Sequence, residues 1–258
     1  MSSLQRSVSS AFTIAEMEAR KIRHDSTELW MRTVQPALWL LIFGEVFNNI
    51  RNLPIPGGFS YIQYVAPGVL AQSVLFVAIF YGINIVWERD VGLLTKLLST
   101  PSSRTSVVVG KALAAGVRGI FMGVMLFGLA LIIGVNVRFD PLDVAGVFFV
   151  VVLFAMCFSC LSMTLASFLK TRDRMMGIGQ VITMPLFFAS NAIYPISLMP
   201  VWLQYVSRYN PLSYVVDAMR SMLLTGDYSS LPLDILVLIL STVFFVGCAS
   251  ILLKRLIE

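Results

Sequence analysis

Residues 61–86 read YIQYVAPGVLAQSVLFVAIFYGINIV and contain no charged side chain. As a helix, a stretch of this length crosses the hydrocarbon core of a bilayer, which is roughly 30 Å thick. Lipid offers the backbone no hydrogen-bond partners, so an apolar segment in it must satisfy its own N–H and C=O groups as a helix. We therefore expect a transmembrane helix here.

Further apolar blocks lie on both sides of this one. Over the whole chain 57% of the residues are hydrophobic and 13% are charged, whereas a soluble domain carries about 25% charged residues. This composition predicts an all-α polytopic membrane protein with six transmembrane helices. The predicted spans are residues 33–47, 61–86, 112–137, 142–169, 175–194 and 231–253.

The positive charges predict the orientation of these spans. Lys and Arg lie between the apolar blocks, and not on one polar face as in nucleic-acid-binding proteins. Most of the 19 fall on one side of a six-span topology, which predicts that both termini are cytoplasmic. The expected location is the plasma membrane of a prokaryote. Residues 1–32 lack the apolar core of a signal peptide, so the first span is expected to act as the targeting signal. Arg118, near the inner end of the third span, is expected to snorkel.

Two segments outside the spans have distinctive patterns. Residues 1–32 form a predicted cytoplasmic segment, in which apolar and charged residues alternate as in an amphipathic helix at the membrane surface. Residues 33–258 form the six-span domain. Within it, residues 192–230 are apolar and rich in prolines that break or start helices, which predicts re-entrant helices in the outer leaflet. Asp217 and Arg220 are spaced to pair on one of them.

Small residues and cysteines also recur in the spans. Ala115, Gly119 and Gly123 form a small-xxx-small series that lets two helix backbones approach closely. The partner is either another span or a second subunit. Cys157 and Cys160 are spaced as CxxC in an apolar helix, without a second Cys or His pair to complete a metal site. We expect them to be buried thiols and expect no bound metal.

The loop 87–111 reads WERDVGLLTKLLSTPSSRTSVVVGK. Val91, Leu94 and Leu98 repeat at helical spacing and form an apolar stripe, which Pro101 ends. Taken alone, these residues favour a connector helix that lies on the membrane surface.

The same loop resembles the first cytoplasmic loop of the type-2 ABC exporter permease family, whose members often read E-R-E-x-G-T-L-E-x-L-L-x-T-P. A second similarity lies before the last span, where these permeases read N-P-L-x-y-x-x-d-x-x-R. The resemblance extends over essentially the whole chain and is strongest to daunorubicin-resistance and nodulation-factor permeases. In the loop the chain matches at Glu88, Arg89, Gly92, Leu94, Leu97, Leu98, Thr100 and Pro101, and departs at Asp90, Leu93 and Thr95. Before the last span it matches at Asn210, Pro211, Leu212, Tyr214, Asp217 and Arg220.

The resemblance implies how such a chain is energised. The loop helix would be a coupling helix seated in a groove of a cytoplasmic ATPase subunit, with its leucines as anchors. Glu88, Arg89 and Asp90 would contact the ATPase, and Gly92 would permit close backbone approach. Two permease copies and two ATPases are expected. The chain itself lacks the G-x-x-x-x-G-K-[ST] pattern, so ATP is expected to bind the partner, with no cofactor and no enzymatic activity in this chain.

The resemblance also implies a pathway between the first, second and fifth spans of both copies. A gate in the fifth span would consist of Met184, Leu186, Phe187, Phe188 and Asn191. Phe187 and Phe188 would stack on cargo, or else be ordinary lipid-facing or packing residues. The cargo is expected to be amphipathic, and a drug, a lipid and a lipid-linked glycan all remain open.

The main alternative is a self-sufficient secondary transporter or channel. Such proteins place ionisable residues near the bilayer midplane, whereas the centres of these spans are nearly free of charge. A membrane-embedded enzyme lacks candidate residues, because His24 is the only histidine and no nucleophile has a partner base. Both alternatives are less favoured than the exporter permease.

Overall fold

The computed structural model describes residues 3–24, 27–44, 46, 56–99, 103–169 and 171–256. Throughout these ranges the chain forms helices joined by short connections, which confirms the all-α prediction. The elements are α1 (Ser3–His24), α2 (Thr27–Leu38), η1 (Trp39–Phe43), η2 (Pro56–Gly58), α4 (Tyr61–Asp90), α5 (Leu93–Leu98), α6 (Arg104–Ile132), α7 (Pro141–Ala166), α8 (Arg172–Phe188), η3 (Ile196–Leu198), α9 (Val201–Tyr209), α10 (Pro211–Arg220), η4 (Ser221–Thr225), α11 (Leu231–Leu252) and η5 (Leu253–Leu256).

Four of the described helices are long and apolar enough to cross a membrane: α4, α6, α7 and α11. They correspond to the second, third, fourth and sixth predicted spans. The first predicted span corresponds to α2 and η1, and its end lies outside the described residues. The fifth corresponds to α8, which has 17 residues.

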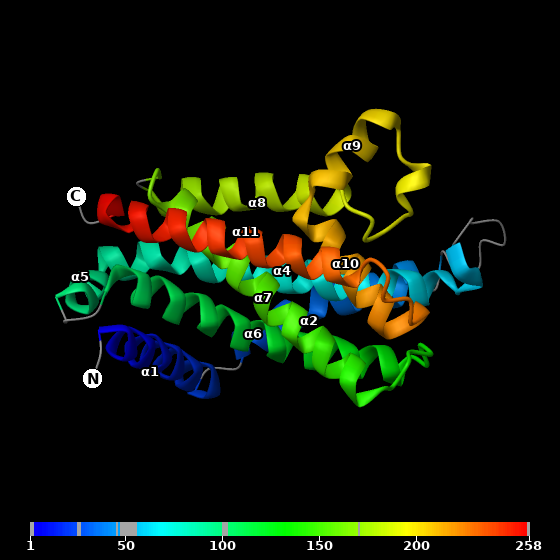
Figure 1. Ribbon diagram of the computed structural model, residues 1–258, viewed down its shortest axis with the longest axis horizontal. Coiled ribbons are helices and arrows are strands. Elements are labelled where there is room, and N and C mark those ends of the chain that lie inside the picture. Colours follow the sequence, from blue (N-terminus) through cyan, green and yellow to red (C-terminus); the bar gives the residue numbers. More distant parts are fainter. Residues whose placement is uncertain are drawn as a thin grey trace.

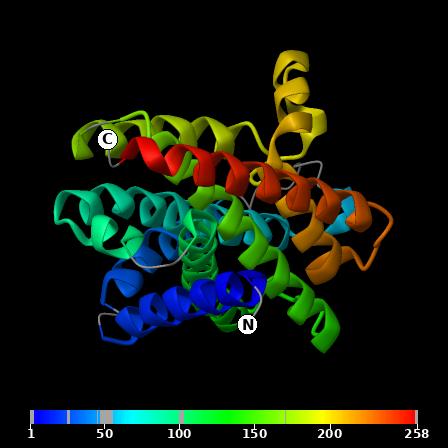
Figure 2. The same ribbon diagram turned by 60° about the vertical axis from the view of Figure 1, so that its left-hand side comes forward.

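The four long helices run side by side along the long axis of the molecule (Figure 1). Helix α1 starts at one end of this axis, and α11 finishes at that same end, where α5 also lies. The connection from α6 to α7 and the turn from α10 to α11 lie at the opposite end (Figure 1). Helix α7 packs against α4, α6 and α11, whereas α9 stands away from the bundle (Figure 2).

Local signals in the sequence explain where the long helices start. Ser60 and Gln63 form a capping box before α4, in which each side chain accepts a hydrogen bond from the backbone N–H of the other. Asp140 caps α7 by accepting from the N–H of Leu142, with Pro141 at the first helical position. These polar groups satisfy N–H groups that the helices themselves leave free.

Small residues on α6 bring it close to α7 of the same chain. A Cβ added to Gly119 would lie 3.2 Å from the Cβ of Ala155, and one added to Gly123 would lie 3.2 Å from the ring of Phe148. The small-xxx-small series therefore serves contact within the chain. On α7, the Cys157 thiol is buried and unpaired, as the sequence predicts, and so is that of Cys160.

The predicted amphipathic N-terminal helix is present as α1, and it packs against α6. Ala11, Ile14, Ala15 and Glu18 form its buried face, whereas Phe12 is 64% exposed. Helix α6 therefore covers one face of α1, the helix that the sequence predicts to lie on the membrane surface.

Candidate functional site

The connection between α4 and α6 turns sharply before α5. Gly92 adopts φ +73°, a left-handed conformation that glycine tolerates far better than other residues. No atom of the described residues lies within 4 Å of a Cβ built on Gly92. Within this chain, glycine is therefore needed at this position for backbone conformation and not for close packing.

The apolar stripe predicted for this loop is partly wrong. Val91 is 70% exposed, because it lies in the turn and the helix begins only after Gly92. Leu94 is fully buried, and Leu98 packs against the main hydrophobic core. These two leucines hold α5 against the protein, whereas Leu97 is half-buried. Two further predicted coupling residues, Thr100 and Pro101, lie outside the described residues.

The three charged residues before the turn differ in their surroundings. The Glu88 carboxylate accepts a hydrogen bond from Nζ of Lys111 at 2.7 Å, so it is engaged inside the chain. Arg89 and Asp90 pair with each other at 2.9 Å, and their side chains are 23% and 33% exposed. Of the three, only Arg89 and Asp90 lie near the surface where a partner would bind.

Glu88 and Lys111 belong to a larger group of buried charges, which we call the inner charge cluster: Glu18, Glu88, Lys111 and Arg118. The side chain of Arg118 on α6 reaches back toward α1, donating to the carbonyl oxygen of Ala114. Its guanidinium lies 3.6 Å from a carboxylate oxygen of Glu18 and 3.9 Å from the centre of the Tyr81 ring. Sequence reasoning missed the cluster because one of its members comes from α1, and the fold of α1 against α6 brings that charge into place.

A cavity of about 250 Å³ lies between α2, η1, α4, α6 and α8. Its walls are aromatic and apolar, with several amide groups and one basic residue, Arg32. The side-chain oxygen of Gln72 on α4 is buried and has no hydrogen-bond partner among the described residues. These helices include the segments assigned to the first, second and fifth spans. The lining residues are Arg32, Gln35, Pro36, Trp39, Gln72, Ser73, Phe76, Val77, Phe80, Met122, Gln180 and Met184.

The residues predicted to form a gate on α8 are spread over different environments. Met184 lines the cavity. Phe187 is buried against Trp39, with ring centres 6.4 Å apart, so it does not face lipid. Leu186 packs at the edge of the main core, and Phe188 is 45% exposed. The structure thus does not gather the five predicted gate residues around one constriction.

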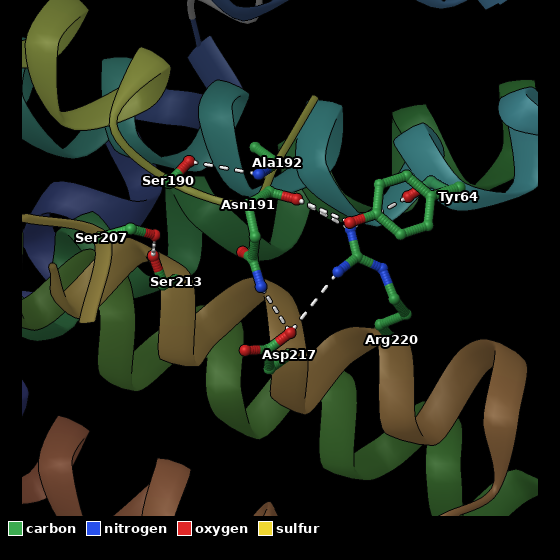
Figure 3. Close-up of polar contacts among 8 residues, drawn as sticks. All are labelled: Tyr64, Ser190, Asn191, Ala192, Ser207, Ser213, Asp217 and Arg220. Carbon is green, nitrogen blue, oxygen red and sulfur yellow. Dashed lines mark hydrogen bonds and ion pairs between the residues drawn. The ribbon is translucent and has the colours of Figure 1, made fainter. Parts of the chain in front are cut away.

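The fifth predicted gate residue, Asn191, belongs to a polar network at the opposite end from α5 (Figure 3). Its amide donates to Asp217 at 2.5 Å, and Asp217 pairs with Arg220 at 3.4 Å, as the sequence spacing predicts. The Arg220 guanidinium also donates to the backbone carbonyls of Asn191 and Tyr64 and lies 3.7 Å from the centre of the Tyr64 ring. This outer network joins α10 to α4 and to the turn after α8.

Asn210 makes a second connection to α8. Its side-chain oxygen caps α10 by accepting from the N–H of Leu212 at 3.0 Å. Its amide donates to the carbonyls of Leu186 at 2.7 Å and Ala189 at 3.3 Å, which lie at the end of α8. The N-P-L motif therefore joins the end of one helix to the start of another. Nearby, a Cβ on Gly68 would clash with the carbonyl oxygen of Ala192, so the turn after α8 lies directly on α4.

Residues 10–224 match the model of a protein family described as ABC-2 type transporter. The chain belongs to the ABC-2 type transporter family. The matched range runs from α1 to η4, so it contains the α5 loop, the inner charge cluster, the cavity and the outer network. The resemblance seen in the sequence is thereby confirmed.

The chain is similar to three proteins that are named as permeases. The transport permease ycf38 of Cyanophora paradoxa is 32% identical over 195 residues, which cover 72% of this chain and 64% of the relative. The inner membrane transport permease YadH of Escherichia coli K12 is 26% identical over 209 residues, with 76% and 77% covered. The daunorubicin resistance ABC transporter permease protein DrrB1 of Streptomyces coeruleorubidus is 23% identical over 206 residues, with 78% and 70% covered. The chain thus spans just under two thirds of the ycf38 relative.

Membership of the ABC-2 type family also separates the functional classes considered from the sequence. The matched family is one of transporters, in agreement with the four candidate membrane spans among the described residues. A self-sufficient secondary transporter or channel, which the sequence already favours less, is a different class of protein.

Proposed function

We propose that this chain is the transmembrane subunit of an ATP-driven exporter, and that a separate cytoplasmic subunit binds and hydrolyses ATP. Family membership and α5 together support the proposal. Helix α5 connects two candidate spans, lies at the end of the molecule near both chain termini, and is preceded by surface charges on Arg89 and Asp90. That arrangement suits a coupling helix, whose displacement moves the attached spans as a unit.

The proposed topology has six spans with both termini in the cytoplasm. Four spans are α4, α6, α7 and α11, and the other two are α2 with η1, and α8. A helix of 17 residues is about 26 Å long, slightly less than the hydrocarbon core, and such a mismatch costs only fractions of a kcal/mol per Å. Both termini on one side require an even number of crossings, and both ends of the chain lie at the same end of the molecule (Figure 1).

The proposed domains follow from this topology. Residues 1–32 are the cytoplasmic N-terminal segment, and residues 33–258 are the transmembrane domain with the coupling loop at 87–111. Residues 192–230 are the re-entrant outer segment, and the exposed aromatic residues of α9 are of the type found at headgroup depth. The location is the plasma membrane of a prokaryote, as the name of the Escherichia coli relative, an inner membrane permease, suggests.

The proposed cargo path runs along the cavity, between two copies of the permease. Aromatic walls with a few amide groups are typical of sites for amphipathic molecules. A drug, a lipid and a lipid-linked glycan each have this character. One relative is named for daunorubicin resistance, so daunorubicin is a suitable first probe.

The experiment that tests this proposal uses the purified chain and the complex isolated with it from the native host. The chain alone should hydrolyse no ATP, and an ATPase subunit should co-purify with it. In proteoliposomes the complex should move daunorubicin or a fluorescent phospholipid only when ATP is supplied. Nucleotide binding by the isolated chain, or transport driven by an ion gradient without the ATPase, would contradict the proposal.

A further inference from the structure

The inner charge cluster joins three helices beside the α5 loop. Its side chains are almost completely removed from solvent: Glu18 and Lys111 are 3% and 4% exposed, and Glu88 and Arg118 are 12% and 14% exposed. Glu18 comes from α1, Glu88 from the end of α4, and the two basic residues from α6. Two negative and two positive charges make the cluster neutral.

The helical register of α4 and α6 explains the pairing. Lys111 and Arg118 are seven residues apart, which is about two turns, so they lie on one face of α6. Tyr81 and Glu88 have the same spacing on α4. Lys111 pairs with Glu88, and Arg118 stacks on Tyr81.

Glu18 bridges the two basic residues from the other side. One of its carboxylate oxygens lies 3.8 Å from Nζ of Lys111, and the other lies 3.6 Å from a guanidinium nitrogen of Arg118. Helices α1 and α6 also touch closely beside the cluster, since a Cβ on Gly110 would lie 2.8 Å from the carbonyl oxygen of Ala11 and 2.8 Å from the Cβ of Ile14. Helix α1 is thus held by both charge and packing.

Glu88 lies four residues before the Gly92 turn, so the cluster forms the base of the α5 loop. We infer that Glu18 and Arg118 are positioning residues for energy coupling: they fasten α1 to the base of the loop, so that the N-terminal helix and the loop move as one rigid body when the ATPase displaces α5. This inference rests on the proposed function. It makes α1 part of the coupling device and not only a surface anchor.

The test compares two double variants that each remove one ion pair without changing the net charge. E18Q/R118Q removes the buried pair. E16Q/R20Q is the matched control, because Glu16 and Arg20 form an exposed pair on the opposite face of the same helix, at 2.7 Å and with side chains 64% and 80% exposed. An exposed pair of this kind contributes little to stability.

The measurement is the distance between spin labels on α1 and α5, in the complex with its ATPase subunit in nanodiscs. Cysteines replace the exposed Thr13 and Thr95, and Cys157, Cys160 and Cys248 become serine. In the wild-type sequence and in E16Q/R20Q, the distance should be narrowly distributed and equal in the nucleotide-free and vanadate-trapped states. In E18Q/R118Q the distribution of distances should broaden. The amount of daunorubicin moved per ATP hydrolysed should fall about tenfold, which is within the ordinary range for coupling between two sites.

Two outcomes would overturn the inference. One is a wild-type distance that changes between the two nucleotide states, because α1 would then move independently of the loop. The other is an E18Q/R118Q variant whose label distance and daunorubicin moved per ATP both equal those of the wild type, because the charges would then only neutralise one another. Failure of the proposed function gives a separate result, since the wild-type complex would then bind no ATPase or show no ATP-driven transport.

Discussion

Asp140 and Asn210 occupy the same local motif, since each precedes Pro-Leu. Each side chain accepts a hydrogen bond at 3.0 Å from the N–H of the leucine two residues later, and so caps the helix that follows. Only Asn210 also donates hydrogen bonds, to two carbonyls at the end of α8. A carboxylate therefore suffices at position 140, whereas position 210 requires an amide for contacts that its own helix does not reveal.

Exchanging the two side-chain types tests this difference. Asp140→Asn keeps the cap and should leave stability nearly unchanged. Asn210→Asp also keeps the cap, but it removes the donor and places a negative charge against two carbonyl oxygens. The loss should be about 1–3 kcal/mol, seen as a lower thermal unfolding midpoint in detergent. Equal effects of the two variants would contradict the assignment.

A second prediction at this scale concerns glycines in two long helices. Gly68→Ala would place a methyl group against the carbonyl oxygen of Ala192, which is backbone and cannot rotate away. Such overpacking costs about 1–3 kcal/mol. A Cβ built on Gly128 of α6 has no described residue within 4 Å, so Gly128→Ala should be neutral or slightly stabilising, because alanine favours helix. The same thermal measurement checks both, and a stable Gly68→Ala variant would show that the turn is not held on α4.

At the scale of the element, α5 has six residues, and isolated helices of that length are unstable in water. Leu94 and Leu98 hold it against the core, and Gly92 provides the turn that starts it. The position of α5 thus depends on its contacts with the main hydrophobic core. The position of the end of α8 also depends on other elements. Asn210, the residue before α10, donates to a carbonyl at the end of α8, and Asn191 in the turn after α8 donates to Asp217 on α10.

The α5 turn gives a prediction about ATPase docking. If the left-handed conformation of Gly92 is what matters, Ala and Leu should impair docking to a similar degree, since either Cβ costs about 1–2 kcal/mol there. Asn should be tolerated better. The amount of ATPase subunit that co-purifies with each variant measures this. A Leu variant much worse than the Ala variant would instead support close approach of the partner's backbone.

At the scale of the whole molecule, α8 packs mainly against α4 and leaves its other side uncovered. Val181 on this side is 69% exposed, and Phe188 is 45% exposed. Gln180 and Met184 of the same helix line the cavity. A second copy of the chain placed here would cover α8 and close the cavity into a path between two subunits.

Cysteine cross-linking tests this arrangement. Val181→Cys should form a disulfide-linked dimer in membranes, because the two copies of α8 would face each other. Val243→Cys on α11 is the control: Val243 is 65% exposed and also lies in an apolar helix, but on a helix that we expect to face lipid. Dimers through position 243 and none through 181 would move the interface to α11 and remove the proposed path.

The sequence alone determined the all-helical class, four of the candidate spans and the family, whereas only the tertiary structure decided which charges and polar groups meet. Apolar length and end caps are local, so α4, α7 and α11 start within one residue of their predicted spans. Helix α6 starts eight residues before its predicted span, because the helix continues through polar residues that the hydropathy pattern assigned to the loop. The loop and N-P-L motifs are contiguous, so the family was recognisable from them. Contacts such as Glu18 with Arg118, or Asn191 with Asp217, join residues far apart in sequence. Their pairing depends on how helices pack, because lipid-embedded helices choose partners by shape and by burial of polar groups, which no single segment contains.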